Sequence, residues 1–202
     1  MPLIVKETDG GNDFVLVPPA TYQAICIMVV DIGRHEVNFK GDVSIKPQVH
    51  IRWELPTERI ERNGVSEPMV IGRTYTLSLH SKSSLRRDLE GWRGRAFTPI
   101  ELNGFDLFSV AGTACQLVVV HNTIGDRTYA NVQSIAGWPK GLKRPKTPET
   151  GILLYSPDKP EHLPDLPQWL RDRIDKQIKE PAADPAAPPP ADGDDLNDDI
   201  PF

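Results

Sequence analysis

The stretch "RTYTLSLHSKSSLRRDLEGWRG" (73–94) changes its periodicity part-way along. In its first eight residues, Tyr75, Leu77 and Leu79 alternate with polar neighbours, which predicts a strand with one face turned inward. The alternation then stops. Serines suited to an N-cap precede a run that ends at the glycines of "GWRG", and this pattern predicts a short helix. A strand followed directly by a short helix restricts the possible fold, which then depends on the strands before and after this stretch.

Two strands are expected before this stretch. The segment "YQAICIMVVDIG" (22–33) is apolar on both faces and predicts a long buried strand. The segment "QVHIRWEL" (48–55) alternates, with Val49, Ile51, Trp53 and Leu55 on one face. The polar segments at 34–47 and 56–68 are predicted as loops.

Two further strands are expected after the helix. They are "LFSVAGTACQLVVVHN" (107–122) and "RTYANVQSIAGW" (127–138), joined by a turn at Gly125 and Asp126. The segment "TPIELNGFD" (98–106) is predicted as a polar turn. Three strands, a short helix and two strands fit a five-stranded antiparallel barrel of the oligonucleotide/oligosaccharide-binding (OB) type, with the helix between strands three and four. We therefore expect an all-β OB barrel in residues 1–138. A small β-sandwich with the helix as a plug is the alternative.

The remaining segments are expected to lie outside the barrel. Residues 139–180 begin as a basic, proline-rich strap and continue as a helix, "LPQWLRDRIDKQIKE" (166–180). Its narrow apolar stripe predicts docking on the barrel or on another subunit, which would make a homo-oligomer. Residues 181–202 have almost no apolar content before their end and are predicted to be a disordered acidic tail.

The net charge of −5 is unevenly distributed. Six of the 28 acidic residues lie in 181–202, which holds no basic residue. The other 22 nearly balance all 23 Lys and Arg, so residues 1–180 are close to neutral. This balance argues against a strongly basic, histone-like protein.

The sequence holds no pattern typical of a catalytic or metal site. Its five histidines lack metal-ligand spacing, and it has no phosphate-binding glycine loop or nucleophile elbow. We expect a protein that is not an enzyme and binds no metal or cofactor. Cys26 and Cys115 lie in apolar runs and are expected as buried thiols. Since we recognise no signal peptide or membrane span, we expect a cytoplasmic location and no membrane partner.

Basic and aromatic residues are mixed through 73–97 and recur elsewhere. Such a mixture favours nonspecific binding of single-stranded nucleic acid, because cations follow the phosphates and flat rings stack on any base. For Trp53 and Tyr75, which lie on apolar faces, packing in the core is the competing interpretation; for Arg86 and Arg87 it is a solvated helix face. The candidate binding residues are Phe39, Lys40, Lys46, Arg52, Trp53, Arg73, Tyr75, Lys82, Arg86, Arg87, Trp92, Arg93, Arg95, Phe97, Tyr129, Lys140, Lys143 and Arg144.

Four segments resemble a known family. "DDIPF" (198–202) is similar to the acidic tip of bacterial single-stranded DNA-binding proteins. "LRRDLEGWRGRAFT" (85–98), "GFDL" (104–107) and "TYANVQSIAGWPKG" (128–141) resemble phage-encoded proteins of that kind. The resemblance implies an OB domain that coats single-stranded DNA during replication, recombination and repair.

The resemblance also implies a docking tip. Asp198, Asp199, Ile200, Pro201 and Phe202 would enter basic pockets on host or phage replication, recombination and repair proteins. The acids would steer the encounter and the Phe202 ring would fill an apolar floor. The alternative is an adaptor whose barrel binds protein and whose tail recruits replication proteins without coating DNA.

Deleting Phe202 alone is expected to weaken binding to a partner pocket by at least about 2 kcal/mol, or some thirtyfold, because small peptide ligands concentrate affinity in one or two anchors. Binding of single-stranded DNA should not change, because all six acids of 181–202 remain. Fluorescence-polarisation titration against replication-restart and recombination proteins measures the difference. Equal partner affinity with and without Phe202 would show that this ring is not the anchor.

Overall fold

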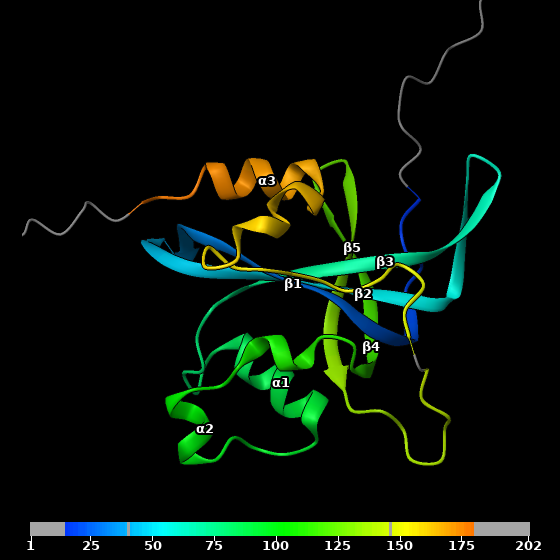
Figure 1. The fold of residues 1–202 in the computed structure, drawn as a ribbon, viewed down its shortest axis with the longest axis horizontal. Coiled ribbons are helices and arrows are strands. Elements are labelled where there is room, and N and C mark those ends of the chain that lie inside the picture. Colours follow the sequence, from blue (N-terminus) through cyan, green and yellow to red (C-terminus); the bar gives the residue numbers. More distant parts are fainter. Residues whose placement is uncertain (1–14, 40, 146, 180–202) are drawn as a thin grey trace, which may run out of the picture.

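Five antiparallel strands form a nearly closed, barrel-like sheet in the computed structural model, which describes residues 15–179 apart from 40 and 146 (Figure 1). The strands are β1 (Ala20–Phe39), β2 (Asp42–Arg62), β3 (Val65–Thr76), β4 (Ala114–Ile124) and β5 (Arg127–Ala136). They pair in the order β3-β2-β1-β4-β5, and the outermost two, β3 and β5, contact each other across the remaining gap. The expected mostly-β fold with five main strands is confirmed.

Short helices lie on both sides of this sheet. The elements between β3 and β4 are α1 (Ser84–Arg93), α2 (Pro99–Asn103) and the 3₁₀ turn η1 (Leu107–Val110). The elements after β5 are β6 (Leu153–Tyr155), η2 (Pro160–Asp165) and α3 (Gln168–Asp175). α1 and α2 lie below the sheet in Figure 1 and α3 lies above it. Within the described ranges, no helix is long and apolar enough to cross a membrane.

β1 is apolar on both faces because it separates two clusters of buried side chains. Ala24 and Cys26 belong to the barrel interior, whereas Ile27 and Val30 belong to an outer cluster. A bulge after Cys26 shifts the alternation between these faces. The outer cluster is completed by β6, which pairs parallel with β1, and by the buried stripe of α3. The helix predicted at 166–180 thus docks on the barrel, although its α-helical part spans only 168–175.

Two segments predicted as polar loops are in fact strands. Residues 34–47 and 56–68 extend the β1–β2 and β2–β3 pairs into long hairpins. Most side chains of these arms remain exposed or only partly buried, so the alternation that would have indicated strands is absent. The second hairpin turns at Asn63 and Gly64, whose φ angles of 51° and 77° are both positive. Asn-Gly is the favoured pair for such a tight turn.

Two other predictions need correction between β3 and β4. The predicted strand at 107–122 begins only at Ala114, because residues 107–110 form η1. The predicted turn at 98–106 contains α2, which starts with a capping box. In this box Thr98 accepts a hydrogen bond from the Glu101 amide, and the Glu101 carboxylate accepts one from the Thr98 amide. The sequence "TPIE" carries this signal.

Helix α1 packs against the barrel and contacts β3 and β5. It ends at Gly94, which adopts the left-handed conformation with φ 68°. Gly91 lies inside the helix at a point of close approach, where a Cβ would lie 2.6 Å from the carbonyl oxygen of Ile135 in β5. The two glycines near the predicted helix end therefore have different roles, one in packing and one in termination.

Trp92→Ala is expected to lower the free energy of unfolding by about 3–5 kcal/mol, measured by urea denaturation. The Trp92 ring is 7% exposed and packs against Trp53, and its Nε1 donates to the Ala114 carbonyl at 3.2 Å. The control, Lys82→Ala at an exposed position before α1, should cost less than about 1 kcal/mol. Similar small losses in both variants would mean that Trp92 does not hold α1 on the barrel.

Candidate nucleic-acid interface

The arginines of residues 73–97 are largely paired with nearby acids. The pairs are Arg73–Asp88, Arg86–Glu90, Arg87–Asp88, Arg93–Glu101 and Arg95–Glu101. The pKa of Glu101 is lowered to about 2, mainly by the hydrogen bond from Arg95 and then by those from Thr98. This carboxylate therefore stays ionised. Lys82, before α1, is exposed. The stretch predicted as a basic binding surface is therefore mainly an ion-pair network, which offers less charge to a phosphate than its composition suggests.

Arg73 joins the two outer strands of the barrel. Its Nη1 donates to the Asp88 carboxylate at 3.0 Å and to the carbonyl oxygen of Val132 in β5 at 2.8 Å. The Tyr75 hydroxyl donates to the same carboxylate oxygen at 3.0 Å. Burial first, and then the neighbouring Asp88, raise the pKa of Tyr75 far above its usual range, so its hydroxyl remains a donor. Arg73 thus serves the closure of the barrel.

Four aromatic residues predicted to stack on bases belong to the core. Trp53, Tyr75, Trp92 and Phe97 are between 0% and 7% exposed. The Phe97 ring meets the Phe105 ring edge-on, with centroids 5.1 Å apart. A buried ring offers no free face to a base, so the stacking predictions for these four residues are wrong. For Trp53 and Tyr75 the competing interpretation, core packing, is correct.

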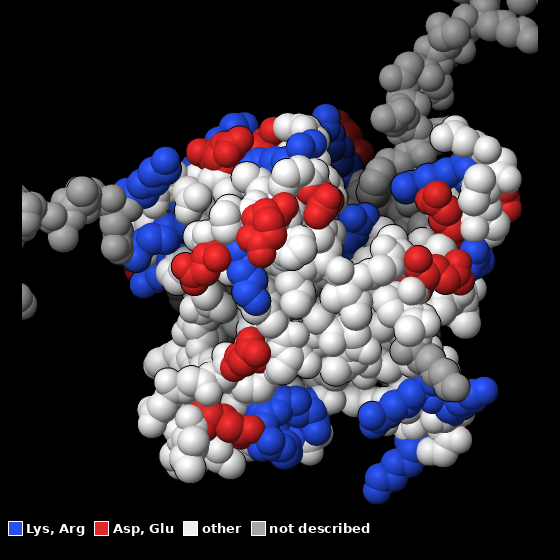
Figure 2. All heavy atoms as spheres, in the orientation of Figure 1, with Lys and Arg blue, Asp and Glu red and all other residues white. Residues whose placement is uncertain are grey.

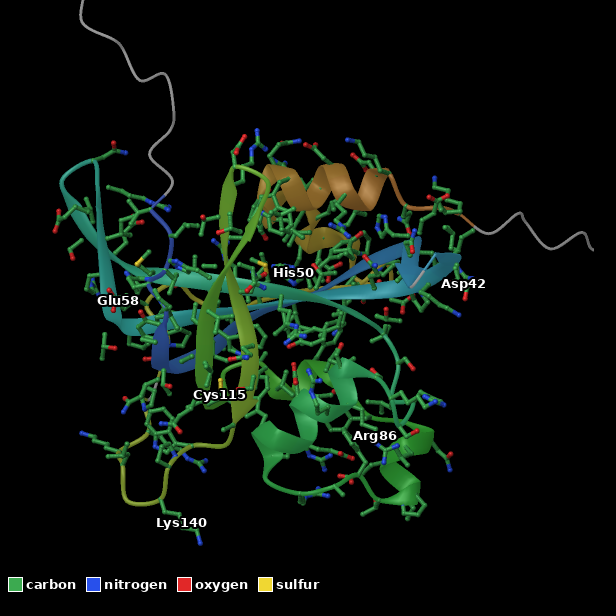
Figure 3. All side chains as sticks on the ribbon, turned by 180° about the vertical axis from the view of Figure 1, so that it is seen from behind. Asp42, His50, Glu58, Arg86, Cys115 and Lys140 are labelled. Atoms are coloured by element: carbon green, nitrogen blue, oxygen red, sulfur yellow. The ribbon has the colours of Figure 1, made fainter. Side chains whose placement is uncertain are left out.

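A groove of about 730 Å³ crosses the outer faces of β2 and β3. Its lining includes His50 and Arg52 of β2 and Gly72 of β3. Tyr129 of β5 and Trp169 of α3 also line it, and these two rings are 43% and 48% exposed. Figure 3 shows His50 at the sheet beneath α3. We call this region the upper groove. Of the candidates predicted from sequence, it brings together Arg52 and Tyr129.

Arg52 is an unpaired cation in the upper groove. Its side chain is half-buried and makes no hydrogen bond or ion pair with any residue that the structure describes. Burial, together with the positive charge of Arg62, lowers the pKa of its guanidinium. Arginine nevertheless stays protonated at neutral pH. A partly desolvated cation without a partner favours an incoming anion such as a phosphate.

His50 supports Trp169. Its ring is 6% exposed and meets the Trp169 ring edge-on, with centroids 5.0 Å apart. Its Nδ1 lies 3.0 Å from the Thr74 hydroxyl. Gly72 leaves room for the imidazole, since a Cβ at that position would lie 2.5 Å from His50 Nε2. Burial, followed by the charges of Arg52 and Arg173, lowers the pKa of His50 to about 4, so the ring is neutral at pH 7.

The other candidates are scattered. Lys140, Lys143 and Arg144 are exposed on the loop after β5, and Figure 2 shows basic side chains gathered there at the lower right. Lys140 lies on the loop at the bottom of Figure 3, away from His50 in the middle of the sheet. Lys46 is exposed on the β2 arm of the first hairpin. The side chain of Phe39, residue Lys40 and the predicted tip, Asp198, Asp199, Ile200, Pro201 and Phe202, lie outside the described residues.

The sequence patterns did not single out Trp169, although its position in the C-terminal segment indicates a surface role. Leu166, Leu170 and Ile174 form the buried stripe of the C-terminal segment. Trp169 precedes Leu170 by one residue and so lies about 100° around the helix from it. A large ring outside the apolar stripe is not explained by packing of that stripe, and such rings are common at binding surfaces.

No protein-family model, curated protein or solved structure matches this chain. The upper groove must therefore be interpreted from its own groups. It offers two exposed rings, the guanidinium groups of Arg52 and Arg62 and a neutral imidazole, which are groups that bind and orient a ligand. In the described ranges, no three His, Cys, Asp or Glu side chains come together as metal ligands.

His50 is expected to make stability depend on pH. Its pKa is about 4 in the folded protein and about 6.5 when unfolded, so the unfolded state binds more protons between these values. The stability gained by keeping His50 neutral is fully present above pH 6.5. It is lost as the pH falls toward 4, by on the order of 3 kcal/mol in total.

His50→Gln should remove this contribution. The free energy of unfolding of the variant, from urea denaturation at pH 7 and pH 4.5, should fall less on acidification than that of the parent protein. His80→Gln, at an exposed position, is the control and should keep the parental dependence. An unchanged dependence in His50→Gln would contradict a buried neutral imidazole.

Proposed function

We propose that this protein binds single-stranded DNA without strong sequence preference through the upper groove, and that its acidic C-terminal segment recruits replication, recombination and repair proteins. One observation carries the proposal. The groove combines two exposed rings, Tyr129 and Trp169, with an unpaired cation, Arg52. Flat rings stack on bases of any identity and cations meet phosphates.

The arrangement of the strands supports an OB-type barrel. The pairing order, the β3–β5 contact and the position of α1 between β3 and β4 are those expected for that fold. OB barrels bind oligonucleotides across strands two and three, beside the loops that join strands one to two and four to five. The upper groove lies over β2 and β3, and Tyr129 belongs to the β4–β5 hairpin beside it.

The charges of the upper groove indicate that stacking supplies more of the affinity than phosphate contacts. Two cations, Arg52 and Arg62, line it together with two acids, Glu67 and Glu149. Glu149 is itself paired with Arg59 at 2.7 Å. With two cations available for phosphates, the log–log dependence of affinity on salt should be shallow, with a slope of about −1.4.

A protein-binding adaptor is the second candidate function. The ion pairs between five arginines of residues 73–97 and three acids favour it, because they leave less free charge on that surface than its composition suggests. The two candidates differ in one measurement. An adaptor would recruit replication proteins through its acidic segment without measurable affinity for single-stranded DNA at low salt.

Trp169→Ala and Tyr129→Ala are each expected to weaken binding of oligo-dT by about 1–3 kcal/mol, or some 5- to 150-fold, because each removes one stacking ring. Arg52→Gln should weaken binding and reduce the magnitude of the salt slope by about 0.7. Arg87→Gln, on α1 at the other side of the sheet, should leave both quantities unchanged. Fluorescence anisotropy of labelled oligo-dT over a range of salt concentrations measures all four variants.

Thermal melts of the same variants identify any loss caused by unfolding. Tighter binding to duplex than to single strand would contradict the proposal. So would undiminished oligo-dT affinity in the Trp169→Ala, Tyr129→Ala double variant.

A further inference from the structure

A second groove, of about 560 Å³, is formed by the end of α1, the segment that includes α2 and η1, and the loop after β5. Phe105 and Trp138 contribute aromatic walls, and Arg93, Arg95 and Arg144 contribute cations. α1 and α2 lie on the other side of the sheet from α3 and the upper groove (Figure 1). We call this second site the lower groove.

The lower groove carries an excess of positive charge. Its three arginines are opposed by one acid, Glu101, which binds both Arg93 and Arg95. Arg144 is exposed and has no ion pair or hydrogen bond within the part of the chain that the structure describes. By contrast, the two cations and two acids of the upper groove balance. An acidic ligand is therefore attracted more strongly to the lower groove.

The aromatic walls suit a ligand that also carries an apolar group. The guanidinium of Arg93 lies 4.3 Å from the centroid of the Phe97 ring and 5.1 Å from that of Phe105. Its Nη1 is buried and has no hydrogen-bond partner among the described residues. Trp138 is only partly buried, and its Nε1 donates to the Leu142 carbonyl at 2.9 Å. Rings and guanidinium groups thus lie side by side in one groove.

We propose that the lower groove binds the acidic segment 192–202 of this same chain. The segment holds five aspartates and no basic residue, followed by Ile200, Pro201 and Phe202. Its carboxylates match the arginines, and the Phe202 ring matches the aromatic walls. Lys140 and Lys143, exposed on the same loop as Arg144, add to the attraction.

The chain is long enough for this contact. Phe202 lies 23 residues beyond Lys179, the last described residue. At about 3.3 Å per residue that length spans up to about 75 Å. A body of this size has a radius of gyration of about 15 Å, so every face is within reach. The covalent link supplies an effective concentration in the millimolar range, which makes weak contacts sufficient.

This inference goes beyond the proposed function, because it assigns the acidic segment a binding site within the protein itself. The two grooves lie on opposite sides of the sheet, so the docked segment leaves the upper groove open. A recruited protein would then have to displace the segment from the lower groove. The contact does not require DNA binding, and the experiment below contains no nucleic acid.

Photo-crosslinking of the full chain tests the contact. Phe202 is replaced by p-benzoylphenylalanine, the protein is irradiated at low micromolar concentration, and the products are mapped by mass spectrometry. The expected crosslinks fall within residues 92–114 or 138–145. In a mixture of ¹⁵N-labelled and unlabelled protein, they should join segments of the same isotope.

Charge variants supply the control. Arg144→Glu in the same background should lower the yield of these crosslinks at least threefold, whereas Lys46→Glu, exposed on the first hairpin, should not. Crosslinks at the upper groove, crosslinks spread evenly over the surface, no crosslinks, or a yield insensitive to Arg144→Glu would each overturn the proposal. Mixed-isotope products would also overturn it, because they would identify a second copy as the donor of the segment.

Discussion

The barrel depends on one buried carboxylate, that of Asp88 in α1. It is 4% exposed and accepts hydrogen bonds from Arg73 and Tyr75 of β3. Since Arg73 also donates to the Val132 carbonyl in β5, one acid connects α1 to both strands that border the gap in the sheet. A buried charge is tolerated only when it is paired, and removing one partner leaves the others uncompensated. The closure of the sheet, and with it the curvature of β2 and β3 beneath the upper groove, therefore depends on this carboxylate.

The outer cluster on β1 positions α3, and through it Trp169, beside the upper groove. Leu170 and Ile174 of α3 are buried against it, which fixes the face that α3 turns toward the sheet. Trp169 then lies over His50, and Gly72 makes space for the imidazole beneath. A second contact secures the helix, as Arg173 donates to the Gln48 side chain at 2.8 Å. An exposed ring is thus held by buried neighbours, and a ring held in this way loses less conformational entropy when a ligand stacks on it.

Sequence patterns predicted the strands and the helix whose buried apolar side chains follow a regular local pattern. The inward face of β2, from Val49 to Leu55, is buried as its alternation indicates, and α1 begins and ends close to its cap signals. The hairpin arms were missed because they have no buried face to produce alternation. Arg86 and Glu90 are four residues apart on a helix and could have been paired from spacing. The Arg73–Asp88 pair depends on how α1 packs against β3, and the Trp169–His50 contact on how α3 packs against β1, which no local pattern encodes.

The near-neutral composition of residues 1–180 does not show how the charges are distributed over the surface, which the structure does. The arginines of 73–97 are paired with three acids, whereas Arg52 in the upper groove and Arg144, with its neighbouring lysines, beside the lower groove have no ion pair within the described residues. A strongly basic upper groove would attract any acidic segment of the same chain as readily as it attracts phosphates. With its charges balanced and two rings exposed, the upper groove instead selects for flat, stackable groups, which aspartates lack. The excess charge on the opposite side of the sheet then provides a separate place for an acidic ligand, so the two kinds of ligand need not compete.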